Sequence, residues 1–340
     1  MSLAQKLGIL YPIIQAPMAG VATPELAAAV SNAGALGSIG IGASSVSAAR
    51  TMIENTQKLT SRPFNVNVFC HERPKRDLQQ EQAWLQFVSP LFKKHGAILP
   101  QELREIYGTF NDQTLALLLA LKPPVVSFHF GVPDFGAISK LKEHGIFTIA
   151  TATSLEEAQL IESRGVDAVI AQGYEAGGHR GTFDSTNTDE RLSTFVLASL
   201  LLQKTGLPVI AAGGIMDGRA IRAYLSLGVA AVQLGTAFVA CPESAANEAY
   251  RRNLLEQPRT LMTSAFSGRP ARGLRNEFTQ FCEQPNAPPP AAYPLAYDLN
   301  KQLTAAGAAS SAHWAGQGAP LTRTMPASEL VSTLVKEAGL

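Results

Sequence analysis

The residue best placed to do chemistry is His179, which stands in the stretch QGYEAGGHRGTF (172–183). Gly177 and Gly178 precede it and Gly181 follows shortly after, so the backbone around this imidazole can pass close to a ligand. Because its ordinary pKa is near neutrality, a histidine can exchange a proton with a substrate or donate a hydrogen bond to an anionic group. The alternative is a loop histidine bonded to backbone. His179 is therefore the first catalytic candidate.

A second candidate, His129, lies in the apolar stretch VVSFHFG (125–131) and shares a face with Ser127 if that stretch is extended. A satisfied core histidine is the alternative. Glu175 could orient His179 through its carboxylate, although a solvated loop acid is the simpler interpretation. The other histidines have no comparable context and are expected at surface or packing positions: His71, His95, His144 and His313. No sequence motif for a metal site is present.

The composition is that of a globular protein of 340 residues, in which 28 Lys and Arg nearly balance 27 Asp and Glu. Without a basic field, neither nucleic acid nor an anionic membrane is an expected partner, and a small molecule fits better. No apolar run reaches the about 18 residues of a membrane span. Three widely spaced cysteines argue against disulfides and zinc and favour a reducing, cytoplasmic location. The expected assembly is a monomer or a homodimer.

Short apolar, β-branched runs alternate with helical patterns along the chain, as a buried parallel sheet requires. Eight runs qualify as strands: 12–18, 35–40, 64–70, 125–131, 146–151, 168–173, 208–213 and 231–236. Helix signals between them include Thr23 and Ser154 as caps and Gly34 and Gly165 as terminators. Eight such units predict an α/β fold, the TIM (β/α)8 barrel, although periodicity leaves a doubly wound open sheet as the alternative.

Two regions interrupt the alternation and predict a second, smaller, mostly helical domain. Residues 71–121 are charged and helical in pattern, and residues 242–325 are rich in Ala, Pro and Gly. The predicted division is a discontinuous barrel (1–70 and 122–241), a helical substrate or lid domain (71–121 and 242–325) and a C-terminal helix (326–340). We expect the helical domain to cover the carboxyl ends of the strands, where barrel enzymes place their active sites.

Glycine-rich segments follow the seventh and eighth predicted strands, as AAGGIMDGRA (211–220) and QLGTAF (233–238). In barrels these two loops most often hold a phosphate, so a phosphate-bearing ligand is expected, with tight turns alone as the alternative. Neither a dinucleotide fingerprint nor a P-loop is present. The segment QAPMAG (15–20) after the first strand could lay backbone against a flat ring or simply turn into the next helix.

Six segments, in their order along the chain, resemble the nitronate monooxygenase family, formerly called 2-nitropropane dioxygenases: QAPMAG, FNVNVF, SFHFG, AQGYEAGGHRG, AAGGI and QLGTAF. The C-terminal SGRPARGLRN, YPLAYDLNK and WAGQG resemble its bacterial class I branch. The family consists of FMN-dependent TIM barrels, so the resemblance implies FMN as the cofactor. It also implies that His179 is the active-site histidine and His129 a second one.

The resemblance implies two further sets of site residues. The FMN set is Met18, Asn67, Gln172, Gly177, Gly178, Gly213, Gly214, Gln233, Leu234, Gly235 and Thr236. The substrate set is Tyr293, Tyr297, Lys301 and Ser267, with Arg269 beside Ser267. At a spacing of four, the tyrosines and the lysine would form one helical stripe suited to a small anion, unless the stripe is a packed amphipathic face. Pro294 interrupts this helix unless it lies in the first turn.

The predicted activity, as the resemblance implies, is the oxidation of alkyl nitronates such as propionate 3-nitronate. O2 is the second substrate, a carbonyl compound and nitrite or other nitrogen oxides are the products, and a flavosemiquinone is the intermediate. His179 would bind or protonate the nitro group. The alternative is an NAD(P)H-dependent FMN reductase of quinones or enoyl-acyl carrier protein, since hydride and nitronate could approach the same flavin face. A third interpretation is a flavin-binding barrel without turnover.

Overall fold

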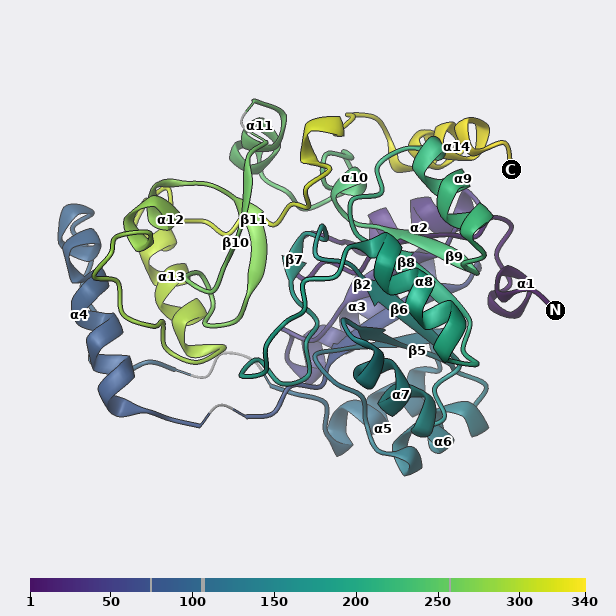
Figure 1. Ribbon diagram of the computed structural model, residues 1–340, viewed down its shortest axis with the longest axis horizontal. Helices are drawn as coiled ribbons and strands as arrows, with labels where there is room; N and C mark the ends of the chain where they lie inside the picture. The colour runs from purple at the N-terminus through teal and green to yellow at the C-terminus, as the bar shows by residue number, and fades with distance from the viewer. Residues whose placement is uncertain (74, 105–107, 257) are drawn as a thin grey trace.

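Eight parallel strands form the centre of the computed structural model, which describes residues 1–73, 75–104, 108–256 and 258–340. The strands are β1 (Ile13–Gln15), β2 (Gly37–Gly40), β3 (Phe64–Phe69), β4 (Val125–His129), β5 (Phe147–Ala152), β6 (Ala168–Gln172), β8 (Val209–Ala212) and β9 (Ala231–Leu234). All the predicted strands are confirmed, because short apolar runs between helical patterns do fold as a buried parallel sheet. Figure 1 shows helices around this sheet.

The sheet has the order β1-β9-β8-β6-β5-β4-β3-β2, and every neighbouring pair is parallel. A parallel bridge between Ile14 and Leu36 joins β1 to the segment that leads into β2. The two ends of the strand order therefore meet, and the sheet curls into a nearly closed barrel. The TIM-barrel prediction is confirmed, and the open doubly wound sheet is excluded.

Helices cover the outside of the barrel. They are α2 (Pro24–Asn32), α3 (Val46–Leu59), α5 (Asp112–Leu121), α6 (Phe135–Glu143), α7 (Leu155–Ser163), α8 (Thr194–Lys204), α9 (Gly218–Leu227) and α14 (Ala327–Ala338). The predicted caps are confirmed, since the Thr23 and Ser154 hydroxyls accept backbone N–H groups at the starts of α2 and α7. Gly34 and Gly165 follow these helices with left-handed φ values of 92° and 78°.

Side chains on each strand alternate between two apolar clusters. In β6, Val169 packs outward with the helices, whereas Ile170 points into the barrel. Leu3 of α1 (Leu3–Leu7) joins the inward cluster, so this helix covers the amino-terminal end of the barrel. Toward the carboxyl ends the inward positions become polar, as Gln172 after Ile170 illustrates. The interior is therefore apolar and closed at one end and polar at the other.

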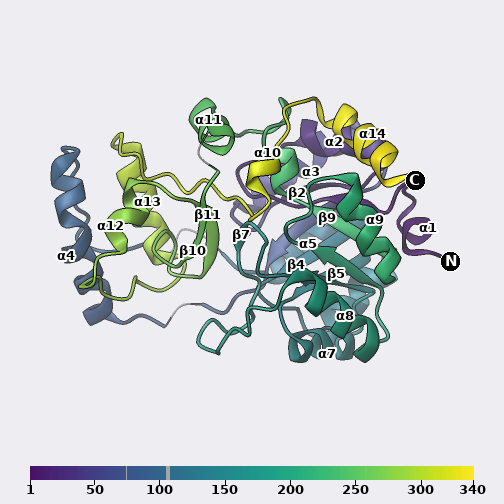
Figure 2. The same cartoon turned by 45° about the horizontal axis from the view of Figure 1, so that its top comes forward.

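A second group of elements lies beside the barrel (Figure 2) and packs around its own apolar cluster, which includes Trp84, Phe92 and Phe266. It contains α4 (Leu78–Lys94), α12 (Glu277–Cys282), α13 (Leu295–Ala305) and an antiparallel sheet of β10 (Thr260–Thr263), β11 (Ala271–Leu274) and β7 (Gly178–His179). The remaining elements are α10 (Thr236–Val239), α11 (Glu248–Glu256) and η1 (Ala319–Leu321). The small sheet is absent from the predicted elements, because its strands are too short to show a period.

The predicted division into domains stays a prediction. α5 lies within the range 71–121, yet its Leu115 and Leu118 pack in the cluster between the barrel strands and the outer helices. Residues 74, 105–107 and 257 belong to the two predicted insertions and lie outside the described residues. Within the described part, the insertion after β9 supplies most of the second apolar cluster.

Candidate active site

A cavity of about 640 Å³ opens at the polar, carboxyl-terminal end of the barrel. Four inward-facing side chains at the strand ends line it: Asn67 of β3, His129 of β4, Gln172 of β6 and Gln233 of β9. The loops after β1, β8 and β9 and part of α13 complete the wall. This volume lies within the range of sites for cofactors and small molecules. The alternation of the strands thus places polar groups from distant parts of the chain around one space.

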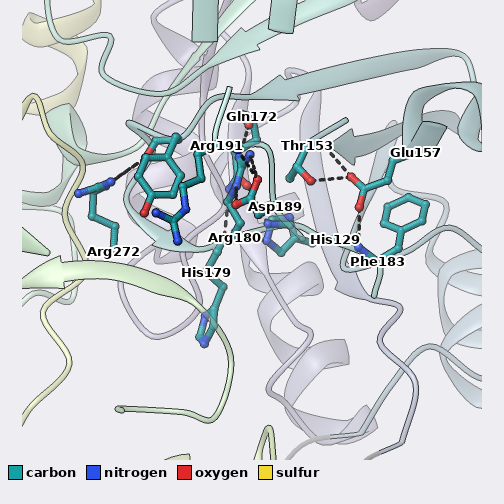
Figure 3. A network of polar contacts seen from close by, with 12 residues as sticks. His129, Thr153, Glu157, Gln172, His179, Arg180, Phe183, Asp189, Arg191 and Arg272 are labelled. Carbon is teal, nitrogen blue, oxygen red and sulfur yellow. Dashed lines mark hydrogen bonds and ion pairs between the residues drawn. The ribbon is translucent and has the colours of Figure 1, made fainter. Parts of the chain in front are cut away.

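The loop that carries His179 is held in place by hydrogen bonds. His179 lies on β7 opposite Ala271 of β11. Its carbonyl oxygen accepts hydrogen bonds from Gln172 Nε2 at 3.0 Å and from His129 Nε2 at 3.2 Å (Figure 3). The Gln172 side chain also accepts the backbone N–H of Gly181 at 2.8 Å through Oε1. The backbone on both sides of the imidazole is therefore fixed before any ligand binds.

The glycines around His179 permit close approach by other parts of the chain. A Cβ at position 177 would lie 2.5 Å from the backbone nitrogen of Gly316, and a Cβ at position 181 would lie 2.9 Å from His129 Cε1. Real Cβ atoms essentially never approach another heavy atom this closely. Gly177 and Gly181 are therefore required by packing, whatever they also do for a ligand.

Arg180, next to the candidate histidine, anchors the following segment. Its Nε and Nη2 donate to the two carboxylate oxygens of Asp189 at 2.8 and 3.0 Å, and Nη1 donates to the Gln172 carbonyl (Figure 3). Arg180 is only 2% exposed, so this bidentate pair compensates a buried charge. Farther along, the Glu157 carboxylate accepts the Phe183 N–H at 2.8 Å. The segment is tied to the barrel at both ends.

The His179 ring lies in the cavity among aromatic side chains. Its Nε2 is 2.8 Å from Ser267 Oγ, and its ring centroid is 4.9 Å from that of Trp314. Burial, followed by the charges of His129 and Arg269, lowers the pKa of His179 to about 3. The expectation from residue type alone, that His179 titrates near neutrality, is therefore wrong, because its buried surroundings lower its pKa. The imidazole is neutral at pH 7 and serves as a hydrogen-bonding group.

His129 lines the same cavity but makes a different contact. Its Nε2 lies against a carbonyl oxygen, which can only accept, so the ring carries its proton on that nitrogen. Burial lowers the pKa of His129 to about 4, and the ring is neutral at pH 7. The observed contact orients the loop that carries His179. A catalytic role for His129 stays a prediction.

All of the residues in the predicted FMN set except one line the cavity: Met18, Asn67, Gln172, Gly177, Gly178, Gly213, Gly214, Gln233, Gly235 and Thr236. Leu234 is the exception. It follows the inward-facing Gln233 and so points outward, where it packs in the helix-facing cluster with 1% of its surface exposed. Its side chain therefore cannot reach a ligand inside the barrel. Strict alternation along β9 would have predicted this outward orientation.

Several groups of this set are free to bind a cofactor. Gln233 Oε1 is buried and has no hydrogen-bond partner in the described part of the protein. Gly213 and Gly214 have φ values of 131° and 70°, in the left-handed region that favours glycine. Thr236 Oγ1 accepts the N–H of Gly316 at 2.9 Å, which leaves the hydroxyl proton available to an acceptor. The wall therefore offers an acceptor, a donor and closely approachable backbone.

The structure brings Tyr293, Tyr297 and Lys301 together at the same cavity. Tyr297 and Lys301 lie on α13, whereas Tyr293 precedes Pro294, which stands at the N-cap of that helix. Lys301 Nζ is 5.1 Å from the centre of the Tyr297 ring. Ser267 does not line the cavity. Its side chain is fully buried and touches the site through His179.

Glu175 does not orient His179. Its carboxylate accepts hydrogen bonds from the backbone nitrogen of Thr194 at 2.8 Å and from Thr194 Oγ1 at 3.0 Å. Thr194 is the first residue of α8, whose initial N–H groups have no partner within the helix and favour a negative charge. The acid is therefore occupied by the start of that helix.

Four aromatic residues of the cavity wall are absent from the predicted site: Phe69, Phe130, Tyr250 and Trp314. Tyr250 lies on α11 and donates its hydroxyl proton to the Trp314 carbonyl, while the Trp314 ring contacts His179. The segment WAGQG offered a signal for Trp314, since it resembles a family motif. Nothing in the charged sequence around Tyr250 marks that residue.

Comparison with known families agrees with this geometry. The family described as nitronate monooxygenase matches residues 1–337. The chain belongs to the nitronate monooxygenase family. A nitronate monooxygenase of Paraburkholderia phytofirmans is 54% identical over 97% of this chain and 93% of the relative. Another, of Pseudomonas aeruginosa, is 51% identical over 97% of each chain.

A solved structure extends the likeness to the fold of this nitronate monooxygenase family member. The nitroalkane oxidase of Streptomyces ansochromogenes matches with a TM-score of 0.89 and 40% identity, over 99% of this chain and 98% of that chain. The protein is thus an enzyme, an oxidoreductase of a flavin-dependent family that acts on small molecules. In the described residues, no helix is both long and apolar enough to cross a membrane. The cytoplasmic location and the oligomeric state stay predictions.

Proposed function

We propose that this enzyme is an FMN-dependent nitronate monooxygenase that oxidises alkyl nitronates, including propionate 3-nitronate, with O2. The products are a carbonyl compound and nitrite or other nitrogen oxides. The observation that carries the proposal is the position of the His179 ring, in the same cavity as the glycine-rich loops after β8 and β9 and the polar residues of α13. One end of that cavity suits a phosphate-bearing cofactor, and the other suits a small anion.

FMN fits the residues at the strand ends. Gly213, Gly214 and Thr236 would hold the phosphate, because left-handed glycines let backbone N–H groups approach it and the threonine hydroxyl can donate. Gln233 Oε1, a buried acceptor without a partner in the described residues, would accept an N–H of the ring system. Met18 would pack on the flat ring. When bound, FMN supplies the redox chemistry, since it can take up an electron from the nitronate.

His179 would bind the nitro group through a hydrogen bond. Because the pKa of His179 is lowered to about 3, the ring is neutral at pH 7 and one nitrogen carries a proton. When Ser267 Oγ donates to Nε2, the proton of the ring lies on Nδ1, and that N–H can donate to a negatively charged nitronate oxygen beside the rings of Trp314 and Tyr293. Of the two predicted roles, binding is therefore favoured over protonation.

The residues of α13 would hold the other end of the substrate. Burial raises the pKa values of Tyr293 and Tyr297, so both phenols stay protonated and can donate hydrogen bonds. Lys301, next to the Tyr297 ring, adds a positive charge at the cavity wall. A small anion such as a carboxylate-bearing nitronate would therefore meet the hydrogen-bond donor of His179 at its nitro end and the donors of α13 at its other end.

The decisive experiment is oxygen consumption by the purified, FMN-loaded protein on propionate 3-nitronate without NAD(P)H. We expect rapid uptake of O2 with release of nitrite. Absence of uptake, together with bleaching of the flavin by NAD(P)H, would favour the quinone or enoyl reductase instead. Absence of both reactions would favour the flavin-binding barrel without turnover.

The role of His179 is tested by His179→Asn, with the exposed His144 changed to Asn as the matched control. Loss of a hydrogen-bond donor to developing or bound negative charge costs about 10²-fold or more in kcat/KM. We expect this loss in His179→Asn with the flavin retained, and no loss in His144→Asn. Unchanged turnover in the flavin-loaded His179 variant would show that the assignment is wrong.

A further inference from the structure

Arg269 is a buried cation, 5% exposed, that takes part in none of the ion pairs within 4.0 Å of the described residues. Its Nη2 donates to the carbonyl oxygens of Thr182 and Phe183, the latter at 3.1 Å, while its Nε has no partner among the described residues. Carbonyl groups and a ring face compensate a guanidinium only in part, so its burial costs stability. Arg180 of the same site, by contrast, has its carboxylate.

The guanidinium lies directly behind the wall of the active-site cavity. Its Cζ is 4.4 Å from the centre of the Phe130 ring. That ring in turn lies 5.6 Å from the ring of His179 and 5.5 Å from that of Tyr293. Phe130 has a left-handed φ of 68°, a conformation that a bulky residue adopts only when its surroundings enforce it. The strained turn after β4 thus places one ring between Arg269 and the residues proposed to hold the substrate.

The cations around this point, Arg180, Arg269 and Lys301, are matched in number by Asp189, Glu157 and Asp184, but Arg180 and Asp189 form a contact pair, whereas none of the ion pairs in the described residues includes Arg269. The groups packed against His179 and Arg269 are His71 after β3, His129 on β4, Arg180 after β7, Glu157 on α7, Asp184 in the following loop, and Tyr293, Tyr297 and Lys301 at α13. Burial lowers the pKa of Arg269 only to about 10, so the guanidinium stays charged at pH 7. His129, His179 and the two phenols are neutral at pH 7, as argued above, and burial lowers the pKa of His71 to about 4 as well. Glu157 and Asp184 raise the pKa of Arg269 by their charge, but neither forms one of the ion pairs of the described residues with it.

We propose that Arg269 is a positioning residue that supplies the fixed positive charge of this site and makes it prefer an anionic ligand over a neutral one of the same shape. It acts through Phe130 and does not line the cavity. The same charge adds to the effect of burial, which lowers the pKa of His179 and keeps its imidazole neutral at pH 7. If the proposed function holds, on which this step rests, the charge of Arg269 makes the site prefer the nitronate anion to the neutral nitroalkane. The cost of burying an unpaired cation is thereby offset when the anion binds.

Two neutral variants and one charged variant test this role. Arg269→Gln keeps donors for the carbonyl groups of Thr182 and Phe183, and Arg269→Met removes the buried polar group altogether, so the two variants have opposite risks for folding. Arg269→Lys keeps the charge. Calorimetric titration of the cofactor-loaded proteins with nitrate and with neutral nitroethane provides the readout.

We expect nitrate binding to weaken at least about tenfold in the Gln and Met variants and to stay within about threefold in the Lys variant, a difference of about 1.4 kcal/mol or more. Nitroethane binding should change less than about twofold in all three, because it carries no charge. Equal weakening of both ligands would reveal a merely structural role and overturn the proposal, as would unchanged nitrate binding. If the neutral variants do not fold, loss of the nitrate preference in Arg269→Lys alone would overturn it.

A second readout does not depend on turnover. In protein labelled at histidine with ¹⁵N, the His179 signals are identified by their absence from His179→Asn. At pH 5 we expect the ratio of protonated to neutral His179 to rise about tenfold in Arg269→Gln, equivalent to one pKa unit, and not in Arg269→Lys. An unchanged ratio in the Gln variant would contradict the proposed field. If wild-type protein consumed no O2 with nitronates, the proposed function would fail while these binding and titration results would still stand.

Discussion

His71 provides a direct test of how burial sets the acid stability of this protein. It is 2% exposed, and neither ring nitrogen has a hydrogen-bond partner in the described structure. Its ring makes an edge contact with Tyr293 at 5.1 Å. Burial, and to a lesser degree the charge of Arg269, lowers the pKa of His71 from 6.5 to about 4. Between pH 6.5 and pH 4, His71 is therefore mostly protonated in the unfolded chain and mostly neutral in the folded protein.

The sign and size of the effect follow from this pKa difference. Well above pH 6.5 both states of His71 are neutral, and the group has no pH-dependent effect on stability. As the pH falls from 6.5 toward 4, the unfolded chain is stabilised by protonation and the folded state is not. Between pH 7.5 and pH 5.5 this difference amounts to about 1.3 kcal/mol of lost unfolding free energy. His71 thus makes the protein less stable in mild acid.

The substitution His71→Met removes the titrating group and keeps a flexible apolar side chain of similar size beside the rings of Phe69, Phe130 and Tyr293. We expect the loss of stability between pH 7.5 and pH 5.5, measured by urea unfolding, to be smaller than in the wild type by about 1.3 kcal/mol. His144→Met, at an exposed position, is the control and should leave the wild-type pH dependence intact. Identical pH dependence in His71→Met and wild type would refute the reasoning that His71 is held neutral by burial.

Two further substitutions test the loop that carries the candidate histidine. In Gly177→Ala the new Cβ would lie 2.5 Å from the backbone of Gly316, so we expect a loss of about 1–3 kcal/mol and reduced flavin content, measured by thermal unfolding and absorbance. The control is Gly108→Ala, where no atom of the described residues lies within 4 Å of the new Cβ, and equal effects at both positions would contradict the packing argument. In Asp189→Asn the buried Arg180 loses its carboxylate, and we expect about 3–5 kcal/mol less unfolding free energy in urea. A loss below about 1 kcal/mol would mean that the pair behaves like an exposed one.

The barrel could be predicted because its signals are local. Each strand is a short apolar run, and caps such as Thr23 and Ser154 act on the residues next to them. The same periodicity shows why polar side chains meet at one end of the barrel and would have shown that Leu234 points away from them. The strands, the helix caps and the inward or outward direction of strand side chains can therefore be predicted from the sequence, because each depends on neighbouring residues.

The electrostatics of the site could not be predicted, because they depend on remote contacts. The pKa of His179 reflects burial by rings from distant segments, among them Trp314, together with the charge of Arg269. Glu175 stands close to His179 in sequence, yet its carboxylate is taken by the start of α8. Neither fact is visible in the spacing of residues.

The return of the chain to the barrel at α14 has a consequence for synthesis. α14 packs against α2 and α9, so the first and last parts of the chain complete one wall together. About 90 residues separate β9 from α14, and at about 5–20 residues per second a ribosome needs roughly 5–20 s to make them. During that interval the apolar faces of α2 and α9 that α14 covers in the folded protein remain exposed. A nascent chain stalled within the insertion would be the species that chaperones must protect.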